Sequence, residues 1–487
     1  MQEEINILTL TAVELSALIR TREISCREVM TRYLEHIDIN NPKVNAIVSL
    51  RNKDELLKEA DEKDQALQNG NYQGWLHGFP FAVKDLALTR GITTTFGSAA
   101  LADHIPSKDS LIVERIKAAG AIIIGKTNTP EFGLGSQTYN SVFGTTANAW
   151  NPALTAGGSS GGTASALAMC LLPVADGSDM MGSLRNPAAF NNIYGFRPSQ
   201  GRVPLSETSE LYFNQMATEG PMGRSVEDIA HLLSTLAGRD DRAPLSLAGD
   251  GSEFTASLSA DCHGLKIGWL GDLGGYLPTE EGILPLCQQA ISRLAELGCH
   301  ITNAELDVDH ERVWQAWCQL RQASVAHALS HLYHSPETRD LLKPEAIWEI
   351  ENGMALSACE LLQAASVRTM FYRAVLRLFK DFDYLLLPAT QVFPFDKNLH
   401  WPAEIAGKRM DTYHRWMEVT IYGSLAGCPV ACVPAGFSPD GLPTGVQILG
   451  KPESDRDVLR LAYAYQQANV DSLTLLPPSI QFATATE

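Results

Sequence analysis

The 487-residue chain lacks an excess of positive charge. It has 38 Lys and Arg against 56 Asp and Glu, which gives a formal net charge of −18. This balance disfavours broad electrostatic binding to nucleic acid or to anionic lipid, although a local basic groove could still exist. We therefore expect neither a nucleic-acid partner nor membrane association.

The sequence also has little that would direct it out of the cytoplasm. Its first residues lack the basic region and apolar stretch of a secretory signal. The longest apolar run, 167–175, is interrupted by Pro173 and is too short to span a bilayer. Nine cysteines form no Cys-x-x-Cys pair, and an odd number without a signal predicts reduced thiols. These absences predict a cytoplasmic protein.

Apolar segments with helical and strand character alternate along the chain. Two amphipathic helices are predicted over 11–40, with Ser25 capping the second. Further helices are predicted over 111–119, 163–172, 280–297 and 309–332, and strands over 79–85, 121–124, 173–175, 265–270, 383–387 and 430–433. This alternation of helices with mostly buried strands predicts an α/β fold.

The length permits one very large domain or two. With 45% apolar and 19% charged residues, the chain has the composition of a globular protein with a substantial core. A polar stretch at 240–263 is the best candidate for an internal boundary.

A lone lysine stands near the end of the apolar segment 79–85. On an extended strand, Lys84 shares a face with Pro80 and Ala82, whereas Asp85 points the other way. Burial would lower the pKa of Lys84 and allow it to act as a base in its neutral form. The alternative is a lysine at a strand end that pairs with a carboxylate.

A first serine segment, Gly157-Gly-Ser-Ser-Gly-Gly162, precedes a predicted helix of small residues. This context suits a loop that holds an anion or an oxyanion at a helix N-terminus. A flexible linker is one alternative, and a nucleophile elbow with a downstream acid and a histidine such as His231 or His414 is another. A phosphate loop is disfavoured because no Gly-Lys-Ser/Thr closes the motif.

A second serine segment, 177–187, places Ser183 in a glycine-containing turn. Consecutive N–H groups of such a turn can form an oxyanion hole around their own serine, and the alternative is a serine that caps a helix. A lysine can supply the base for a serine nucleophile without histidine. If Lys84 meets both serine segments in space, the chain is an acyl-transfer enzyme.

Together these segments resemble the amidase signature family. The 75 residues from Lys84 to Ser159 and the 24 from Ser159 to Ser183 fit that family's arrangement. The likeness covers most of the chain and is weakest over about 240–420. Other matching segments are Gly125–Gly133, Gly195–Arg202, Glu219–Asp228, Gly427–Gly436 and Gly441–Gln447.

The resemblance implies a large mixed, mostly parallel twisted sheet covered by helices on both faces. It implies a single domain over 1–487, in which helices fill 1–60, the core covers about 60–235 and 420–475, and a variable substrate-side region covers about 240–420. Family members are often dimers, so a homodimer is compatible with it, but the sequence does not specify the oligomeric state.

The resemblance also assigns catalytic roles. Ser183 would be the nucleophile, and Ser159, which would follow a cis peptide bond from Gly158, would relay its proton to neutral Lys84. No metal and no cofactor is implied. His327, His331 and His334 share one helical face, but no further ligand pattern accompanies them, so a polar helix face is the favoured interpretation.

By the same resemblance, the turn before Ser183 would hold the oxyanion through the backbone N–H groups of Met180, Met181, Gly182 and Ser183. Asp179 and Arg185 would brace the loops.

The sequence departs from the common family pattern at two places. Met181 stands where many members have glycine, so the turn should not need a positive φ there, and its side chain is a candidate for narrowing the acyl pocket. Asn191-Asn192 replaces a common Cys-Gly pair. Because the three reacting groups remain, we infer a difference in specificity rather than a loss of catalysis.

The leading hypothesis is hydrolysis of a small carboxylic amide to the acid and ammonia or amine; ester or aryl amide substrates would use the same chemistry. The alternative is the glutaminase (A) subunit of a tRNA-dependent amidotransferase, which would need partner subunits and acylated tRNA. The Met180-Met181 turn and the acidic balance weigh against it. A catalytically inactive binding protein is disfavoured because Lys84, Ser159 and Ser183 are all retained.

Candidate residues for the substrate pocket are Tyr139, Met181, Tyr212 and Trp416. Aromatic residues near the variable region suggest an aryl or alkyl acyl group, and Tyr413–Trp416 is the most suggestive stretch. Ordinary core packing is the alternative for each aromatic residue alone.

Overall fold

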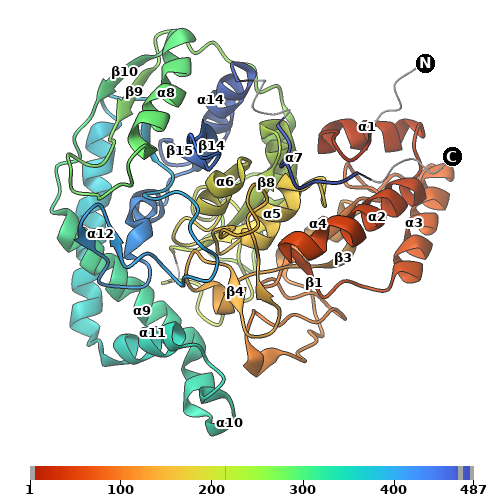
Figure 1. The fold of residues 1–487 in the computed structure, drawn as a ribbon, viewed down its shortest axis with the longest axis horizontal. Coiled ribbons are helices and arrows are strands. Elements are labelled where there is room, and N and C mark those ends of the chain that lie inside the picture. The colour runs from red at the N-terminus through yellow and green to blue at the C-terminus, as the bar shows by residue number, and fades with distance from the viewer. Residues whose placement is uncertain (1–5, 214, 470–474, 483–487) are drawn as a thin grey trace.

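Helices and strands alternate throughout the described part of the chain (Figure 1). The computed structural model describes residues 6–213, 215–469 and 475–482. The helices of this part are α1 (Ala12–Thr21), α2 (Cys26–Val44), α3 (Lys53–Gln68), α4 (Leu111–Ala118), α5 (Gly161–Ala168), α6 (Arg185–Asn191), α7 (Val226–Leu236), α8 (Ile283–Glu296), α9 (His310–His334), α10 (Pro336–Arg339), α11 (Pro344–Ala355), α12 (Ala358–Leu378), α13 (Ile421–Ala426) and α14 (Asp455–Gln467). The strands are β1 (Ile47–Val48), β2 (Pro80–Lys84), β3 (Ile122–Thr127), β4 (Tyr139–Asn140), β5 (Gly144–Thr145), β6 (Ala175–Asp179), β7 (Tyr194–Arg197), β8 (Thr218–Gly223), β9 (Lys266–Trp269), β10 (His300–Asn303), β11 (Tyr384–Pro388), β12 (Glu404–Ile405), β13 (Lys408–Arg409), β14 (Val430–Phe437) and β15 (Pro443–Leu449). Single 3-10 turns lie at Ala99–Leu101, Glu131–Gly133, Ser252–Thr255 and Arg415–Thr420.

Most predicted elements are present, with bounds that shift by a few residues. Helices α1 and α2 occupy the predicted range 11–40, and the Ser25 hydroxyl caps α2 by accepting a hydrogen bond from the Glu28 N–H. The strand predicted over 173–175 is misplaced. It begins only at Ala175 and continues to Asp179 as β6, because these residues pair with β8.

An eight-stranded mixed sheet lies at the centre, in the order β10-β9-β11-β15-β14-β7-β8-β6. The predicted α/β class is confirmed, but the expectation of mostly parallel strands is wrong. Of the pairs in this described sheet, β10–β9 and β11–β9 are parallel, and the other five are antiparallel. Antiparallel neighbours such as β14 and β15 need only a short connection, whereas parallel neighbours need a long crossover.

Helices cover both faces of this sheet, as the resemblance implied. On one face, the Gln447 side chain of β15 accepts a hydrogen bond from Arg185 of α6. On the other, a Cβ at Gly450 would meet Val458 of α14. Positions 447 and 450 point in opposite directions because side chains alternate along an extended chain. The two helices therefore lie on opposite sides.

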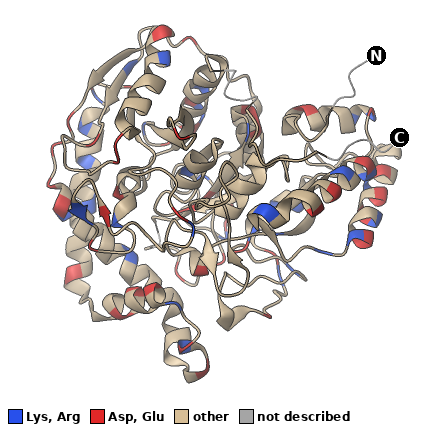
Figure 2. Ribbon diagram, viewed as in Figure 1, with Lys and Arg blue, Asp and Glu red and all other residues tan. Residues whose placement is uncertain are grey.

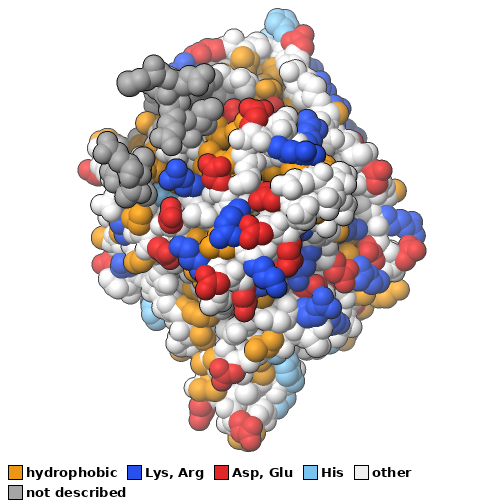
Figure 3. All heavy atoms as spheres, turned by 90° about the vertical axis from the view of Figure 1, so that its right-hand side faces the viewer, with side chains coloured by type: hydrophobic (Ala, Val, Ile, Leu, Met, Phe, Trp, Pro, Cys, Tyr) orange, Lys and Arg blue, Asp and Glu red, His pale blue; other side chains and the backbone are white. Residues whose placement is uncertain are grey.

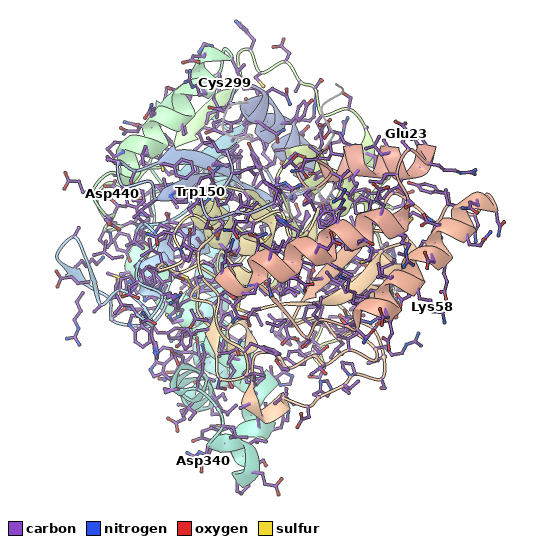
Figure 4. All side chains as sticks on the ribbon, turned by 45° about the vertical axis from the view of Figure 1, so that its right-hand side comes forward. Glu23, Lys58, Trp150, Cys299, Asp340 and Asp440 are labelled. Atoms are coloured by element: carbon purple, nitrogen blue, oxygen red, sulfur yellow. The ribbon has the colours of Figure 1, made fainter. Side chains whose placement is uncertain are left out.

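The region 240–420 is joined to the rest of the molecule through the sheet. Strands β9, β10 and β11 form one end of the central sheet, so the polar stretch 240–263 does not separate two sheets. Helices α9, α11 and α12 pack against one another on the side away from α2 and α3 (Figure 1). Helix α10 projects from this group, with Asp340 at its tip (Figure 4).

A three-stranded sheet, in the order β1-β3-β2, lies beside β6. Its strand β2 runs parallel to β3, and Lys84 is the last residue of β2. Contact between β2 and β6 brings this lysine close to the segment that leads to Ser183.

Charged side chains of both signs are mixed along α2 and α3, and the face of the molecule near these helices shows no large area of one sign (Figures 2 and 3). Among the described residues, no helix combines the length and the apolar character that crossing a membrane requires.

Candidate active site

Two strand ends and two helix starts meet around Lys84. Lys84 closes β2 and Ser178 lies on β6, whereas Ser159 and Ser160 precede α5 and Ser183 precedes α6. The Ser160 N–H donates to the Ser183 carbonyl at 3.3 Å, which joins the two serine segments directly. Residues that are far apart in the sequence therefore form one cluster.

Three serine hydroxyls surround the Lys84 amine. Its Nζ lies 2.8 Å from the Oγ atoms of Ser159 and Ser160 and 3.0 Å from that of Ser178. Only 1% of the lysine is exposed, and burial lowers its pKa to about 7. The interpretation as an ion-paired lysine is wrong: the Asp176 carboxylate accepts from the Lys84 backbone N–H, not from Nζ.

The hydrogen bonds around Nζ leave one role for each serine. A neutral amine donates two hydrogen bonds and accepts one. The Ser160 hydroxyl donates to the Ser178 carbonyl at 3.4 Å, so its oxygen accepts from Lys84. When Ser178 accepts the second amine proton, the lone pair of Nζ faces the hydroxyl of Ser159. This arrangement readies Ser159 to give its proton to Lys84.

The Gly157–Gly162 segment is a packed loop. All six residues are buried, so the interpretation as a flexible linker is wrong. A Cβ on Gly162 would lie 2.3 Å from the backbone nitrogen of Asn128, which leaves room only for glycine. The peptide bond between Gly158 and Ser159 is cis, as the resemblance implied.

The turn from Asp179 to Leu184 is organised by one carboxylate. Asp179 accepts hydrogen bonds from the N–H groups of Gly182, at 2.9 Å, and Leu184, at 3.1 Å. The N–H of Gly182 is therefore occupied, although it was expected to face the oxyanion. Within the described chain, the N–H groups of Met180, Met181 and Ser183 have no hydrogen-bond acceptor. Three of the four expected donors are free.

Backbone conformation in this turn agrees with the residue types. Gly182 has φ of +82°, whereas Met181 has no positive φ, as expected for a bulky side chain. The Ser183 hydroxyl does not cap α6, because the N-cap residue is Leu184 and no side chain caps this helix. The interpretation of Ser183 as a helix cap is therefore wrong.

Two buried arginines hold Asp179 in place. Arg185 donates to it through Nε, at 2.9 Å, and through a terminal nitrogen, at 2.8 Å. Arg197 contacts the same carboxylate at 3.3 Å. Burial alone would favour the neutral acid, but Arg185 and Arg197 together hold the pKa of Asp179 well below its usual value. These contacts fit the bracing role expected of Asp179 and Arg185.

The unusual Asn191-Asn192 pair supports the first serine segment. The Asn191 side chain donates to the carbonyls of Ala156, just before the loop, and Pro187, both at 2.9 Å. Asn192 ends α6 with φ of +55°, a conformation that asparagine tolerates better than most residues. The pair thus keeps the backbone geometry while adding hydrogen bonds to the loop.

A cavity of about 210 Å³ opens at Ser159 and Ser183. Its lining residues are Leu86, Phe132, Gly133, Leu134, Gly135, Ser159, Ser178, Asp179, Met180, Met181, Ser183, Ala217, Arg321, Ser324, Val325, Ala328, Leu329 and Met417. Most of these side chains are apolar, and a face of α9 forms one wall.

Of the four expected pocket residues, only Met181 lines this cavity. Tyr139 donates its hydroxyl to Glu345 at 2.5 Å and stacks on His400. Tyr212 is 67% exposed, and Trp416 is buried, with its indole N–H donating to the Tyr413 carbonyl. Sequence proximity to the variable region was a poor guide, because these aromatic side chains point elsewhere.

Several site residues were not predicted. Ser160 and Ser178 contact the lysine amine, and the wall on α9, including Arg321, comes from the variable region. Ser160 was visible within the first serine segment, but nothing in the sequence separated the lining face of α9 from an ordinary core-facing one.

The nucleophile-elbow alternative is not supported by the histidines. Neither His231 nor His414 lines the cavity, and the His414 ring stacks on Tyr413 with ring centres 4.5 Å apart. In the part of the chain that the structure covers, no group of three or more His, Cys, Asp or Glu side chains is arranged to hold a metal.

Comparison with known proteins agrees with this geometry. A family model for amidases matches residues 28–459. An acylamidase of Rhodococcus erythropolis is 32% identical over 467 residues, which cover 95% of this chain and 96% of that protein. The glutaminase (A) subunit of the glutamyl-tRNA(Gln) amidotransferase of Synechococcus sp. is 36% identical and covers 92% of this chain and 90% of its own. The crystal structure of a bacterial aryl acylamidase of the amidase signature family superposes with a TM-score of 0.90, at 30% identity over 95% of this chain and 97% of that one.

The chain therefore belongs to the amidase signature family. It is an enzyme, a hydrolase that acts on carbon–nitrogen amide bonds.

Proposed function

We propose that this chain acts alone as an amidase, which hydrolyses a small carboxylic amide to the acid and ammonia or amine through an acyl-enzyme on Ser183. The environment of Lys84 carries the proposal. A buried amine with a pKa lowered to about 7 accepts protons near neutral pH, which a solvated lysine does not. Ser159 contacts this amine and lines the cavity together with Ser183.

Acylation begins when the Ser183 hydroxyl oxygen attacks the amide carbon. Its proton passes to Ser159, whose own proton passes to Lys84. The carbonyl oxygen becomes an oxyanion, which accepts from the free N–H groups of the turn; losing one such donor typically costs ~3 kcal/mol. The proton then returns from Lys84 through Ser159 to the leaving nitrogen, and the carbon–nitrogen bond breaks.

Deacylation uses the same relay with water in place of the serine. Water attacks the ester carbon, and its proton passes through Ser159 to Lys84. The proton then returns to the Ser183 oxygen as the carbon–oxygen bond breaks and the acid leaves. The cycle restores every group, so the reaction consumes only the amide and one water molecule.

The cavity favours a small substrate. Its volume of about 210 Å³ is below the ~300–1,000 Å³ that is usual for pockets that bind drug-sized ligands. The mostly apolar lining favours an alkyl or aryl group next to the reacting carbonyl.

A glutaminase subunit of a tRNA-dependent amidotransferase is the second candidate. The 36% identity to a protein of that kind favours it. It would act on glutamine and would need partner subunits and acylated tRNA. The net charge of −18 weighs against a tRNA-bound role.

Ammonia release from a panel of small amides by the purified full chain tests the proposal. We expect turnover without any partner; turnover of glutamine only, and only with partner subunits and tRNA, would support the second candidate instead. Ser183→Ala should abolish turnover and prevent labelling by a serine-directed fluorophosphonate. Persistent labelling on Ser159 would show that the nucleophile is misassigned.

A further inference from the structure

One charged side chain in the cavity wall has no part in the proposed mechanism. The wall residues on α9 recur at intervals of three and four and so share one helix face: Arg321, Ser324, Val325, Ala328 and Leu329. Four of these are small or apolar. Asp179, the other charged residue of the lining, is already paired with two arginines. Arg321 is therefore the cation that faces the substrate space.

The Arg321 guanidinium is held rigidly from behind. Its side chain is 4% exposed, and its Nε donates to the Glu349 carboxylate at 2.6 Å. One terminal nitrogen donates to the Tyr413 hydroxyl at 2.8 Å, and that hydroxyl donates to the same Glu349 oxygen at 2.6 Å. The three side chains form a closed triangle that fixes the plane of the guanidinium.

The remaining terminal nitrogen of Arg321 lacks a strong acceptor. Within the described residues its contact is the thioether sulfur of Met180, at 3.4 Å, and sulfur is a weak acceptor. Met180 also lines the cavity, so this nitrogen is the end of the guanidinium that reaches the substrate space. A buried charged donor without a good acceptor is unfavourable, and a substrate oxygen would relieve this cost.

The charge balance selects the kind of acceptor. The positive charge of Arg321 is already neutralised by Glu349, whose second carboxylate oxygen is buried without a hydrogen bond. A substrate carboxylate would place a further negative charge near this unsatisfied oxygen in a buried site. A neutral oxygen adds a hydrogen bond without adding charge.

We propose that Arg321 binds an uncharged hydrogen-bond acceptor of the substrate, a carbonyl or ether oxygen, at the α9 side of the cavity. This inference rests on the proposed function and names its substrate class: small uncharged amides with a second oxygen a few atoms from the reacting carbonyl. The oxygen takes the place of the Met180 sulfur at the guanidinium.

Two matched pairs of amides test the inference. Methoxyacetamide and butanamide differ only by an ether oxygen in place of a methylene on the acyl side, and N-(2-methoxyethyl)acetamide and N-butylacetamide differ likewise on the amine side. We expect kcat/KM to favour the ether in one of the pairs by about tenfold or more, as for a hydrogen bond from a charged donor. Ratios near one in both pairs would overturn the inference. So would a stronger preference for succinamate than for succinamide.

Variants show whether Arg321 is responsible. Arg321→Met should bring the ether-to-methylene ratio to about one, and Arg321→Lys should restore part of it. The double variant Arg321→Met/Glu349→Gln avoids leaving a buried carboxylate unpaired and keeps the test valid if the single variant fails to fold. Arg368→Met is the matched control, because that buried arginine donates to backbone carbonyls and does not line the cavity. An unchanged ratio in folded Arg321→Met would contradict the proposal.

Binding to Ser183→Ala separates this inference from the proposed function. The Kd of the preferred ether should be lower than that of its methylene partner, and Arg321→Met in the same background should remove the difference. A Kd preference without turnover of any amide by the wild type would refute the proposed function and leave the inference standing. Turnover of both pairs without a preference would do the reverse.

Discussion

Lys84 and Lys126 are both buried lysines, but their surroundings give them different roles. Lys126 donates to the Ala87 carbonyl and to the Thr89 hydroxyl at 2.9 Å, and burial lowers its pKa to about 8, while the charge of Asp85 opposes that shift. Lys84 contacts three serine hydroxyls, one of which lines the cavity. A lowered pKa alone therefore does not identify the base; the serine that connects Lys84 to the cavity does.

The acidic limb of the pH profile should report on Lys84. The amine accepts a proton only when it is neutral, so kcat/KM for an amide should rise with pH through an apparent pKa near 7. Initial rates of ammonia release between about pH 5 and pH 9 measure this limb. Lys84→Ala should lose activity while circular dichroism shows a retained fold. Full activity of this variant would eliminate Lys84 as the base.

At the residue scale, the sequence was a good guide to the reacting groups. Lys84, Ser159 and Ser183 were predicted from their motifs and their spacing, and the structure brings them together. Ser160 and Ser178 were missed because a hydroxyl contact to an amine depends on the approach of β6 to β2, and no local pattern encodes that approach.

At the element scale, the turn between β6 and α6 depends on the buried Asp179 carboxylate. It accepts from two backbone N–H groups and two arginines and so sets which N–H groups remain free. The sequence predicted that Asp179 and Arg185 brace the loops. It did not predict that Gly182 would be occupied.

Asp179→Asn should destabilise the protein strongly. The change leaves Arg185 and Arg197 without their charge partner in a buried site, for which a loss of about 3–5 kcal/mol in the free energy of unfolding is expected. Urea denaturation followed by circular dichroism measures the loss. Asp241→Asn is the control: its pair with Arg239 is exposed, and exposed pairs contribute about 0–1 kcal/mol. Equal stability of the two variants would refute the bracing role.

Gly182→Ala should be more harmful than Gly441→Ala. Both glycines have positive φ, +82° and +77°, so an alanine at either position is strained by roughly 1–2 kcal/mol. A Cβ at Gly182 would also lie 2.5 Å from Thr420 Cγ2, whereas nothing lies within 4 Å at Gly441. Overpacking should add about 1–3 kcal/mol and move the turn. Thermal unfolding and kcat/KM of both variants check this; a Gly182 variant as active and stable as the Gly441 variant would contradict it.

At the scale of the whole molecule, the variable region provides one wall of the active site. Helix α9 lies between β10 and β11 in the chain, and both strands belong to the central sheet. The sequence predicted that substrate-side residues come from this region, but it selected aromatic residues. The actual wall consists of small and aliphatic side chains with one arginine.

The overall charge leads to a prediction about tRNA. A chain with a net charge of −18 should not retain tRNA by electrostatic attraction at physiological salt. Gel retardation of labelled tRNA by the purified chain at about 50 and 200 mM salt is the measurement. We expect no shifted band and no effect of tRNA on amide turnover. A retarded complex whose affinity falls steeply with salt would favour the amidotransferase candidate.

The sequence by itself determined the chemistry and the local structure. The strand that carries Lys84, the two serine segments and the glycines that their loops require are all short-range features, because residue type and spacing are sufficient to specify them. Only the tertiary structure decided the direction of most strands in the central sheet, the hydroxyl partners of the Lys84 amine and the position of Arg321 in the cavity wall. These depend on contacts between segments that are far apart in the chain, and local periodicity does not report such contacts.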